Sequence, residues 1–180
     1  MKQDAPPALR NPHGNLALSC LIGQGAFGQV YAAEHLTYKK KLAVKVEWRE
    51  VDRVVNEQGF SMLLREAKIL MAMRTKSGFP SVKEFKSTDK FHYLVMDRLG
   101  PNVNSLLRFC NQKFSLKTTL MIFDQAVLRL ETLHGAGFLH RDVKPDNFVV
   151  GDEHNQEHLY LIDFGVSKAF KNSDGSACLI

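Results

Sequence analysis

An acid, a cation and an amide lie within six positions of one another, at Asp142, Lys144 and Asn147. Asp142 is suited to accept or orient the proton of an attacking hydroxyl, and Lys144 is suited to offset charge on a transferring phosphoryl group. The amide of Asn147 supplies the hard oxygen that Mg²⁺ prefers. The motif H-R-D-x-x-x-x-N over residues 140–147 therefore predicts phosphoryl transfer, with these three residues in catalytic roles.

A glycine-rich string, G-x-G-x-x-G, spans residues 23–28. In dinucleotide-binding folds the same string opens a helix. Here the next residues, 29–33, are rich in β-formers and carry no helix cap. The pattern favours a β-hairpin whose tip, free of side chains, can lie over phosphate groups; an ordinary glycine-rich turn is the alternative.

Lys45 and Glu66 are expected to form an ion pair. Residues 42–47 alternate as a strand that puts Ala43 and Lys45 on one face. Residues 58–73 have the apolar spacing of a helix, and Glu66 lies beside its apolar stripe. A carboxylate there needs a partner, and Lys45 is the candidate, although exposed surface roles are the alternative for both. The apolar faces of the strand and the helix are formed by Leu42, Val44 and Val46, and by Leu63, Ala67 and Leu70.

The apolar patterns predict a small antiparallel sheet of about five strands plus this helix, followed by a mainly helical region. Gly100-Pro101 breaks regular structure, and the stretch over residues 97–101 is expected to form a hinge between two lobes. Beyond it we expect helices over 104–110 and from the cap residue Ser115 to about His134. The expected strands cover residues 16–22, 29–35, 42–47, 82–85 and 91–96.

The long helix carries apolar residues at helical spacing, and we interpret them as packing residues. After residues 140–147, a short strand pair is expected at 147–150 and 159–162. The connection contains H-x-x-E-H at 154–158, which some zinc peptidases use on a helix. A polar turn cannot place both histidines on one helical face, so a metal site is not predicted there. The apolar helix residues are Leu116, Leu120, Phe123, Val127 and Leu130.

The separations of the motifs carry further information. Gly23 to Lys45 is 22 positions, Lys45 to Glu66 is 21, and Asp142 to Asp163, the first residue of Asp-Phe-Gly, is also 21. Each motif lies on its own predicted element, in the order that the protein-kinase mechanism uses. The chain therefore resembles the eukaryotic protein kinases.

The resemblance runs from Gly23 to Gly165 and implies an α+β fold with two lobes. Residues 1–15 would be a flexible tail. Residues 16–98 would form the N-lobe, with the five-stranded antiparallel sheet and its helix. Residues 99–180 would form a helical and incomplete C-lobe that ends inside the activation segment.

The implied cofactors are ATP and Mg²⁺. Asn147 and Asp163 would carry the metal, and Glu66 would fix Lys45 against the phosphates. The adenine would lie between the lobes, below Val30. The residues expected to bind the nucleotide are Ile22, Gly23, Gln24, Gly25, Ala26, Phe27, Gly28, Val30, Ala43, Lys45, Met96, Asp97, Leu99, Val149 and Ile162.

Three stretches are similar to the casein kinase I group, which includes the tau-tubulin kinases: residues 96–102, 113–118 and 140–148. The similarity implies serine/threonine phosphorylation, often of acidic or already phosphorylated protein substrates. The family's basic pocket for phosphorylated substrates would be incomplete here; only Lys168 and Lys171 lie in the region of the sequence where it is expected. The oligomeric state is not indicated.

Composition excludes several other classes. The chain has 180 residues, 44% of them apolar and 24% charged, and a net charge of +5, which suits one soluble domain that binds anions. No membrane-length apolar run or signal peptide is visible, and three distant cysteines suggest a reducing compartment. We expect a cytoplasmic or nuclear protein without a membrane partner. No aromatic-interleaved basic patch predicts nucleic-acid binding.

The last residues, 175–180, do not resemble the continuation of the kinase family. We therefore expect a truncated C-lobe with exposed apolar surface. Two functions stay open: an active kinase, and a catalytically silent fragment that binds nucleotide or a partner protein. The chain as it stands is expected to bind Mg-ATP weakly and to transfer little phosphate.

Overall fold

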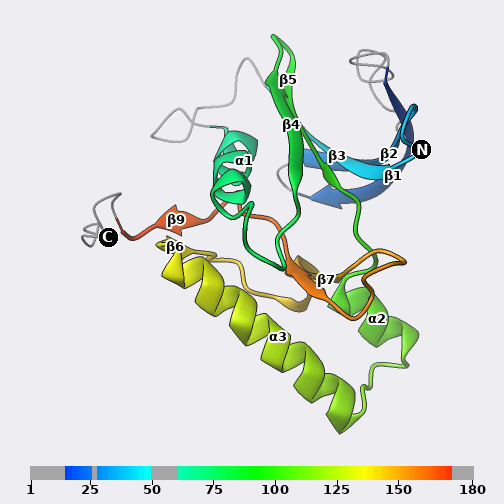
Figure 1. Ribbon diagram of the computed structural model, residues 1–180, viewed down its shortest axis with the longest axis vertical. Coiled ribbons are helices and arrows are strands. Elements are labelled where there is room, and N and C mark those ends of the chain that lie inside the picture. Colours follow the sequence, from blue (N-terminus) through cyan, green and yellow to red (C-terminus); the bar gives the residue numbers. More distant parts are fainter. Residues whose placement is uncertain (1–14, 26–27, 50–60, 172–180) are drawn as a thin grey trace. The chain divides into compact units, whose positions relative to one another are not determined.

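The computed structural model describes residues 15–25, 28–49 and 61–171 (Figure 1). The chain divides into two compact units. One unit comprises Met1–Lys68 and Ser81–Arg98, and the other comprises Ile69–Pro80 and Leu99–Ile180. The fold is a mixed α+β fold, as the sequence predicts.

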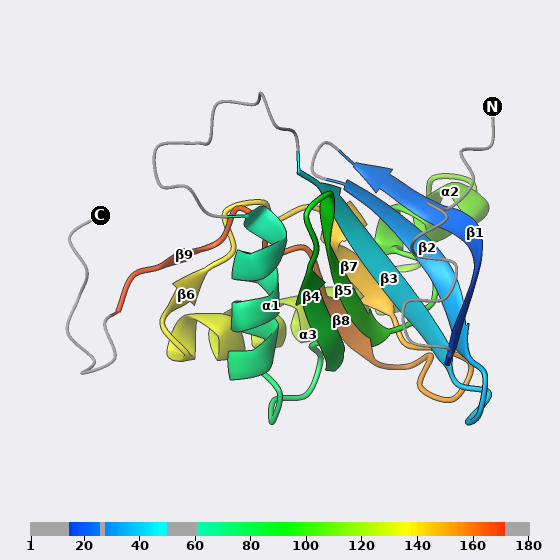
Figure 2. The same cartoon turned by 90° about the horizontal axis from the view of Figure 1, so that it is seen from above.

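The first unit is built on a five-stranded antiparallel sheet (Figure 2). The strand order is β1-β2-β3-β5-β4. The predicted hairpin at the glycine string is confirmed, because β1 and β2 are antiparallel neighbours and Gly25 pairs with Gly28. The strands are β1 (Leu16–Gly25), β2 (Gly28–His35), β3 (Lys41–Trp48), β4 (Val82–Ser87) and β5 (Phe91–Asp97).

One face of this sheet carries a hydrophobic core. The three apolar residues of β3 that share a face, Leu42, Val44 and Val46, are all buried in it, which confirms the predicted alternation. The neighbouring strands supply aromatic partners, among them Tyr31 and Tyr93. The opposite face of β3 is therefore left for Ala43, Lys45 and Glu47.

The helix α1 (Met62–Ala72) follows the sheet strands in the chain. Its predicted apolar stripe is confirmed, since Leu63, Ala67 and Leu70 are all buried. The start of the helix was predicted too early: Ser61 precedes the first helical residue, because its side chain caps the helix. Residues 58–60 lie outside the described residues.

The second unit contains two helices and short strands. The predicted cap of the long helix is confirmed, because the Ser115 hydroxyl accepts a hydrogen bond from Thr118 N at 3.1 Å. Among the described residues, no helix is both long and apolar enough to cross a membrane. The elements are α2 (Val103–Phe109), α3 (Leu116–Gly135), β6 (Phe138–Leu139), a 3₁₀ turn η2 (Pro145–Asn147), β7 (Phe148–Val150), β8 (Leu159–Leu161) and β9 (Lys168–Ala169).

The packing role predicted for the apolar residues of α3 is wrong for most of them. Leu116, Leu120, Phe123 and Val127 are 75%, 58%, 66% and 47% exposed. In the described part of the second unit, α3 packs on β6 and β8, and the side chains it buries are Arg129 and Leu133. The outcome agrees instead with the expectation of exposed apolar surface in this region.

The predicted short strand pair is confirmed as β7 and β8, which are antiparallel. Asn147 lies in η2 and not in the strand. The connection over residues 151–158 consists of turns, as the sequence indicates for the H-x-x-E-H stretch. Its histidines contact their own neighbours: His154 lies 3.8 Å from Glu153 and His158 lies 3.1 Å from Glu157.

Candidate active site

Lys45 and Glu66 form the predicted ion pair in the first unit. Lys45 Nζ lies 2.6 Å from Glu66 Oε2, and the two side chains are 13% and 3% exposed. The pair joins β3 to α1, as the sequence predicts. Removal of either partner would leave a buried charge without its counter-charge, which costs more than the pair itself contributes.

Strand register places four predicted nucleotide-binding residues on one face of the sheet. Val30 pairs with Lys45 across β2 and β3, and Ala43 pairs with Met96 across β3 and β5. Directly paired residues of antiparallel strands point to the same side, as do residues two apart on one strand. This face, opposite the core described above, therefore combines small and apolar side chains with the mostly buried ammonium group of Lys45.

The glycine hairpin needs Gly28 for steric reasons. Gly28 has a φ of 148°, and a Cβ there would lie 2.2 Å from the Val46 carbonyl oxygen. A glycine lets β3 approach the tip of the hairpin. Ile22, earlier on β1, is 48% exposed. The predicted residues Ala26 and Phe27 lie outside the described residues.

Asp97, predicted at the hinge, uses its side chain within the first unit. Its Oδ1 lies 2.9 Å from Lys40 and 3.1 Å from Lys83. Burial alone would raise the pKa of the Asp97 carboxyl, but hydrogen bonds from both lysines outweigh burial and hold the pKa below its ordinary value. Any role of Asp97 in nucleotide binding therefore falls to its backbone.

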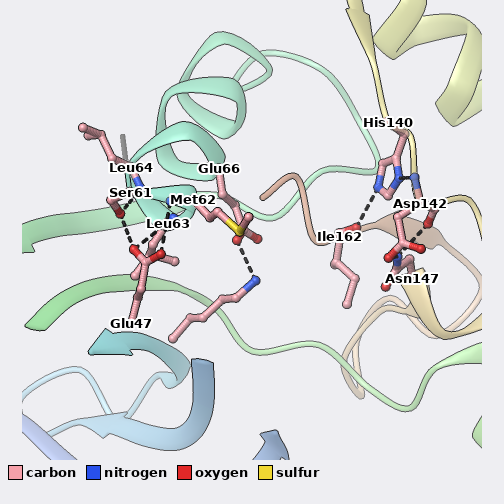
Figure 3. A network of polar contacts seen from close by, with 11 residues as sticks. Glu47, Ser61, Met62, Leu63, Leu64, Glu66, His140, Asp142, Asn147 and Ile162 are labelled. Atoms are coloured by element: carbon pink, nitrogen blue, oxygen red, sulfur yellow. Dashed lines mark hydrogen bonds and ion pairs between the residues drawn. The ribbon is translucent and has the colours of Figure 1, made fainter. Parts of the chain in front are cut away.

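The second unit brings Asp142, Lys144 and Asn147 together. Lys144 Nζ lies 2.7 Å from Asp142 Oδ2, and Asn147 Nδ2 donates to the same oxygen at 3.0 Å (Figure 3). The hydrogen bond from Lys144 is the main reason that the pKa of the Asp142 carboxyl is lowered. Asp142 is therefore ionised at neutral pH and stays partly exposed, at 34%.

His140 is buried and binds the backbone both of the loop that carries Asp142 and of Ile162. The buried imidazole contacts the Ile162 carbonyl through Nε2 at 2.9 Å, and its Nδ1 accepts a hydrogen bond from Asp142 N at 3.3 Å (Figure 3). This pattern assigns the proton to Nε2. Burial is the main cause that lowers the pKa of His140, and the ring of Phe164 packs against it edge-on, at 5.2 Å between centroids.

We expect the free energy of unfolding to fall as the pH drops below about 6.5, the ordinary histidine value, because the unfolded chain binds a proton at His140 that the folded chain excludes. The slope for one proton approaches about 1.4 kcal/mol per pH unit. Urea unfolding at a series of pH values would measure it. His140→Gln should flatten the slope, whereas His134→Gln, at an exposed position of α3, should leave it unchanged.

Two non-glycine residues of the site adopt left-handed backbone conformations. Arg141 has a φ of 68° and Asp163 a φ of 66°. Such conformations persist only where the surroundings hold them. Here Arg141 Nε donates to the Val166 carbonyl, and Ser167 Oγ donates to the His140 carbonyl at 3.1 Å. The segment after Asp163 is thus fastened to the loop that carries Asp142.

The metal-ligand role of Asn147 and Asp163 stays a prediction, and the contacts of Asn147 are compatible with it. The amide nitrogen of Asn147 donates hydrogen bonds to the backbone carbonyl and to the side chain of Asp142. The amide oxygen therefore remains as the atom that could bind a cation. The described residues contain no group of three or more His, Cys, Asp or Glu side chains that could hold a metal. A hard cation held by one carboxylate, one amide and phosphate oxygens of a substrate is the usual arrangement for Mg²⁺.

Contacts from α2 and the preceding residues fix the end of the loop. Asn104 Nδ2 donates to Asp146 Oδ1 at 2.8 Å, and Gly100 and Pro101 exchange backbone hydrogen bonds with Val150. The predicted residues Val149 and Ile162 flank this region. Val149 is buried on β7, and Ile162 N donates to the Asn147 carbonyl at 3.0 Å.

Sequence reasoning missed two supporting side chains on α3. Gln125 bonds the backbone at both ends of its amide, accepting from Leu159 N at 2.8 Å and donating to the Glu157 carbonyl at 2.9 Å. Arg129, 5% exposed, donates to the Leu159 carbonyl. Both are polar residues that interrupt the apolar pattern on the side of α3 that faces β8. Such an interruption could have indicated that these side chains bind backbone groups of a neighbouring element.

A comparison with protein-family models places the chain in a known family. The model described as the protein kinase domain matches residues 17–178. The match covers both units, and it includes the Lys45–Glu66 pair as well as the loop that carries Asp142 and Asn147.

Proposed function

This chain belongs to the protein kinase domain family, and from that premise we propose that it is an ATP-dependent serine/threonine kinase of the casein kinase I group. Protein kinases as a family transfer the γ-phosphoryl group of Mg-ATP to protein hydroxyls. The observation that carries the proposal is the buried ion pair between Lys45 and Glu66, 2.6 Å apart. In this family the corresponding pair must form for phosphoryl transfer.

In this proposal the residues of each unit have separate tasks. Lys45 contacts the phosphates, and Glu66 fixes its ammonium group. Val30, Ala43 and Met96, on the face of the sheet that also carries Lys45, cover the adenine. These tasks suit a lysine that is mostly buried, at 13% exposure, because water then screens its charge less than it screens an exposed charge.

Asp142 orients the substrate hydroxyl in the proposed reaction. Its pKa lies below the ordinary value, so the carboxylate is a weak base and a good hydrogen-bond acceptor. It accepts the hydroxyl proton as the transfer proceeds, and Lys144 beside it offsets charge on the transferring group. When bound at Asn147 and Asp163, Mg²⁺ would neutralise charge on the phosphates.

The substrate class rests on the similarity to the casein kinase I group over residues 96–102, 113–118 and 140–148. We propose acidic or already phosphorylated protein substrates in the cytoplasm or nucleus. The net charge of +5 supports anionic partners. Lys168 and Lys171, both exposed, are the candidate contacts for a substrate phosphate.

The decisive experiment follows phosphate transfer from radiolabelled ATP to an acidic serine peptide, beside nucleotide binding by calorimetry. Transfer that depends on Mg²⁺ supports the kinase proposal. Binding of Mg-ATP without transfer supports the alternative, a catalytically silent nucleotide-binding chain. Absence of both contradicts the proposal.

Lys45→Met is expected to weaken Mg-ATP binding and to lower transfer by roughly 10²-fold or more, because the variant lacks one fixed positive charge at the phosphates. Lys86→Met serves as the matched control, since Lys86 lies on the edge strand β4 of the same sheet and pairs with Glu84, away from the predicted nucleotide contacts. Equal loss in both variants would contradict a specific role for Lys45.

A further inference from the structure

The strand that carries Lys45 makes a second contact with α1, through Glu47. Glu47 lies two residues after Lys45 on β3, so both side chains point to the same face of the sheet. Its carboxylate reaches the first turn of α1. Glu47 Oε1 accepts a hydrogen bond from Met62 N at 3.1 Å, and Oε2 accepts one from Leu63 N at 3.3 Å (Figure 3).

Ser61 completes the contact. Its hydroxyl hydrogen-bonds to Glu47 Oε2 and also accepts a hydrogen bond from Leu64 N at 3.0 Å (Figure 3). The backbone N–H groups of the first helical turn have no acceptor within a helix. Here Met62, Leu63 and Leu64 are all satisfied by the side chains of Glu47 and Ser61. The negative carboxylate also lies at the positive end of the helix dipole.

The two contacts between β3 and α1 match in spacing. Two residues along a strand span about 6.6 Å, and four residues along a helix span about 6 Å. Glu47 meets Met62 and Lys45 meets Glu66, so strand and helix are joined at two points about one helical turn apart. A single contact would allow the helix to slide or pivot, whereas two matched contacts fix its position along the strand.

We propose that Glu47 is a positioning residue that holds the first turn of α1 to β3, so that Glu66 reaches Lys45. Its importance for catalysis rests on the proposed kinase function, but its effect on the ion pair does not. Without the Glu47 carboxylate, α1 keeps its helical hydrogen bonds beyond the first turn but loses one of these two points of attachment to β3. The ammonium group of Lys45 then spends more time apart from Glu66 and becomes more accessible.

The test measures the reactivity of Lys45 in the full chain, by brief acetylation with acetic anhydride and mass spectrometry. Exposed Lys90 serves as the internal reference. Glu47→Ala should raise the relative labelling of Lys45 roughly two- to fivefold, the range expected from losing a carboxylate at a helix N-terminus. Glu47→Gln keeps one of two acceptor oxygens and should give a smaller increase.

Ser61→Asp separates capping from attachment. Aspartate is as good a helix cap as serine, but its negative charge repels the negative charge of Glu47. The helix α1 should therefore keep its cap and lose its attachment to Glu47 on β3. This variant should label Lys45 as fast as Glu47→Ala does. Glu34→Ala is the matched control, because Glu34 lies on neighbouring β2 and pairs with Lys39; it should label at the wild-type rate.

Unchanged Lys45 labelling in Glu47→Ala and Ser61→Asp would overturn the proposal, even if the amides of residues 62–64 exchanged faster. That result would mean that Glu47 only caps the helix. If Glu47→Ala does not fold, Glu47→Gln and Ser61→Asp decide the matter. The labelling needs no nucleotide, so it stays informative if the chain transfers no phosphate and the kinase proposal fails. If the wild-type chain is active, loss of transfer in these variants should rank in the same order as their labelling.

Discussion

Asp142→Asn should abolish most phosphoryl transfer, by about 10²- to 10⁴-fold, the usual contribution of a positioned acid or base. The amide keeps the shape of the carboxylate but can neither take up a proton nor balance the charge of Lys144, which lies 2.7 Å away. Because Asn147 donates to Asp142 Oδ2 at 3.0 Å and to its backbone carbonyl at 2.7 Å, the loop should keep its backbone anchor. Nucleotide affinity should therefore stay unchanged while the rate falls.

The measurement compares kcat for peptide phosphorylation with the Kd for Mg-ATP in the same preparations. Asp124→Asn is a suitable control, since Asp124 is an exposed residue of α3 in the same unit. It removes the same charge from the surface and should change neither quantity. A parallel loss of affinity and rate in Asp142→Asn would show that Asp142 supports the structure of the site and not the reaction.

The sheet and the two longer helices could be predicted because their residues repeat at the period of their structure. Leu42, Val44 and Val46 alternate along β3, and the helical stripe of α1 runs through Leu63 and Ala67. The strands β6 and β9 were not predicted. Each has two residues, which is too short to carry any period, and their pairing depends on the path of the whole second unit.

The exposed residues of α3 mark another limit of periodicity. The spacing of Leu120, Phe123 and Val127 identifies an apolar face, but it does not say which element packs on that face. The polar residues of α3, and not its apolar stripe, mark the side of the helix that packs against β8. Arg129 interrupts the apolar sequence and is almost fully buried, at 5% exposure, because the backbone of β8 offers it an acceptor.

In the candidate site, too, some contacts could be predicted from the sequence and others could not. The Lys45–Glu66 pair could be predicted because a carboxylate beside an apolar stripe needs a cation, and the spacing of the motifs restricted the choice. The contact between Glu47 and Ser61 could not. Strand alternation already puts Glu47 on the face of Lys45, and Ser61 is a good helix cap, but joining them requires the position of the helix against the strand.

Gly78→Ala should destabilise the second unit by roughly 3 kcal/mol, the sum of about 1–2 kcal/mol for a left-handed alanine and about 1–3 kcal/mol for a broken buried hydrogen bond. Gly78 has a φ of 83°, and a Cβ there would lie 1.8 Å from Arg129 Nε and 2.2 Å from its Cδ. Arg129 would have to move, although its Nε holds the Leu159 carbonyl at 2.8 Å. The Gly78 carbonyl in turn accepts from Leu161 N at 2.9 Å, so a shift of the backbone at residue 78 would disturb β8 at Leu161 as well as at Leu159.

Gly135→Ala supplies the control with the opposite sign. Gly135 is the last residue of α3, and a Cβ there would meet nothing within 4 Å. The same added methyl should stabilise the chain by up to about 1 kcal/mol, since alanine favours the helix over glycine. Urea unfolding of both variants measures the difference. Equal effects would mean that Arg129 yields without cost; a loss confined to Gly78→Ala would mean that β8, and with it the segment leading to Asp163, depends on the space that this glycine leaves for the buried guanidinium.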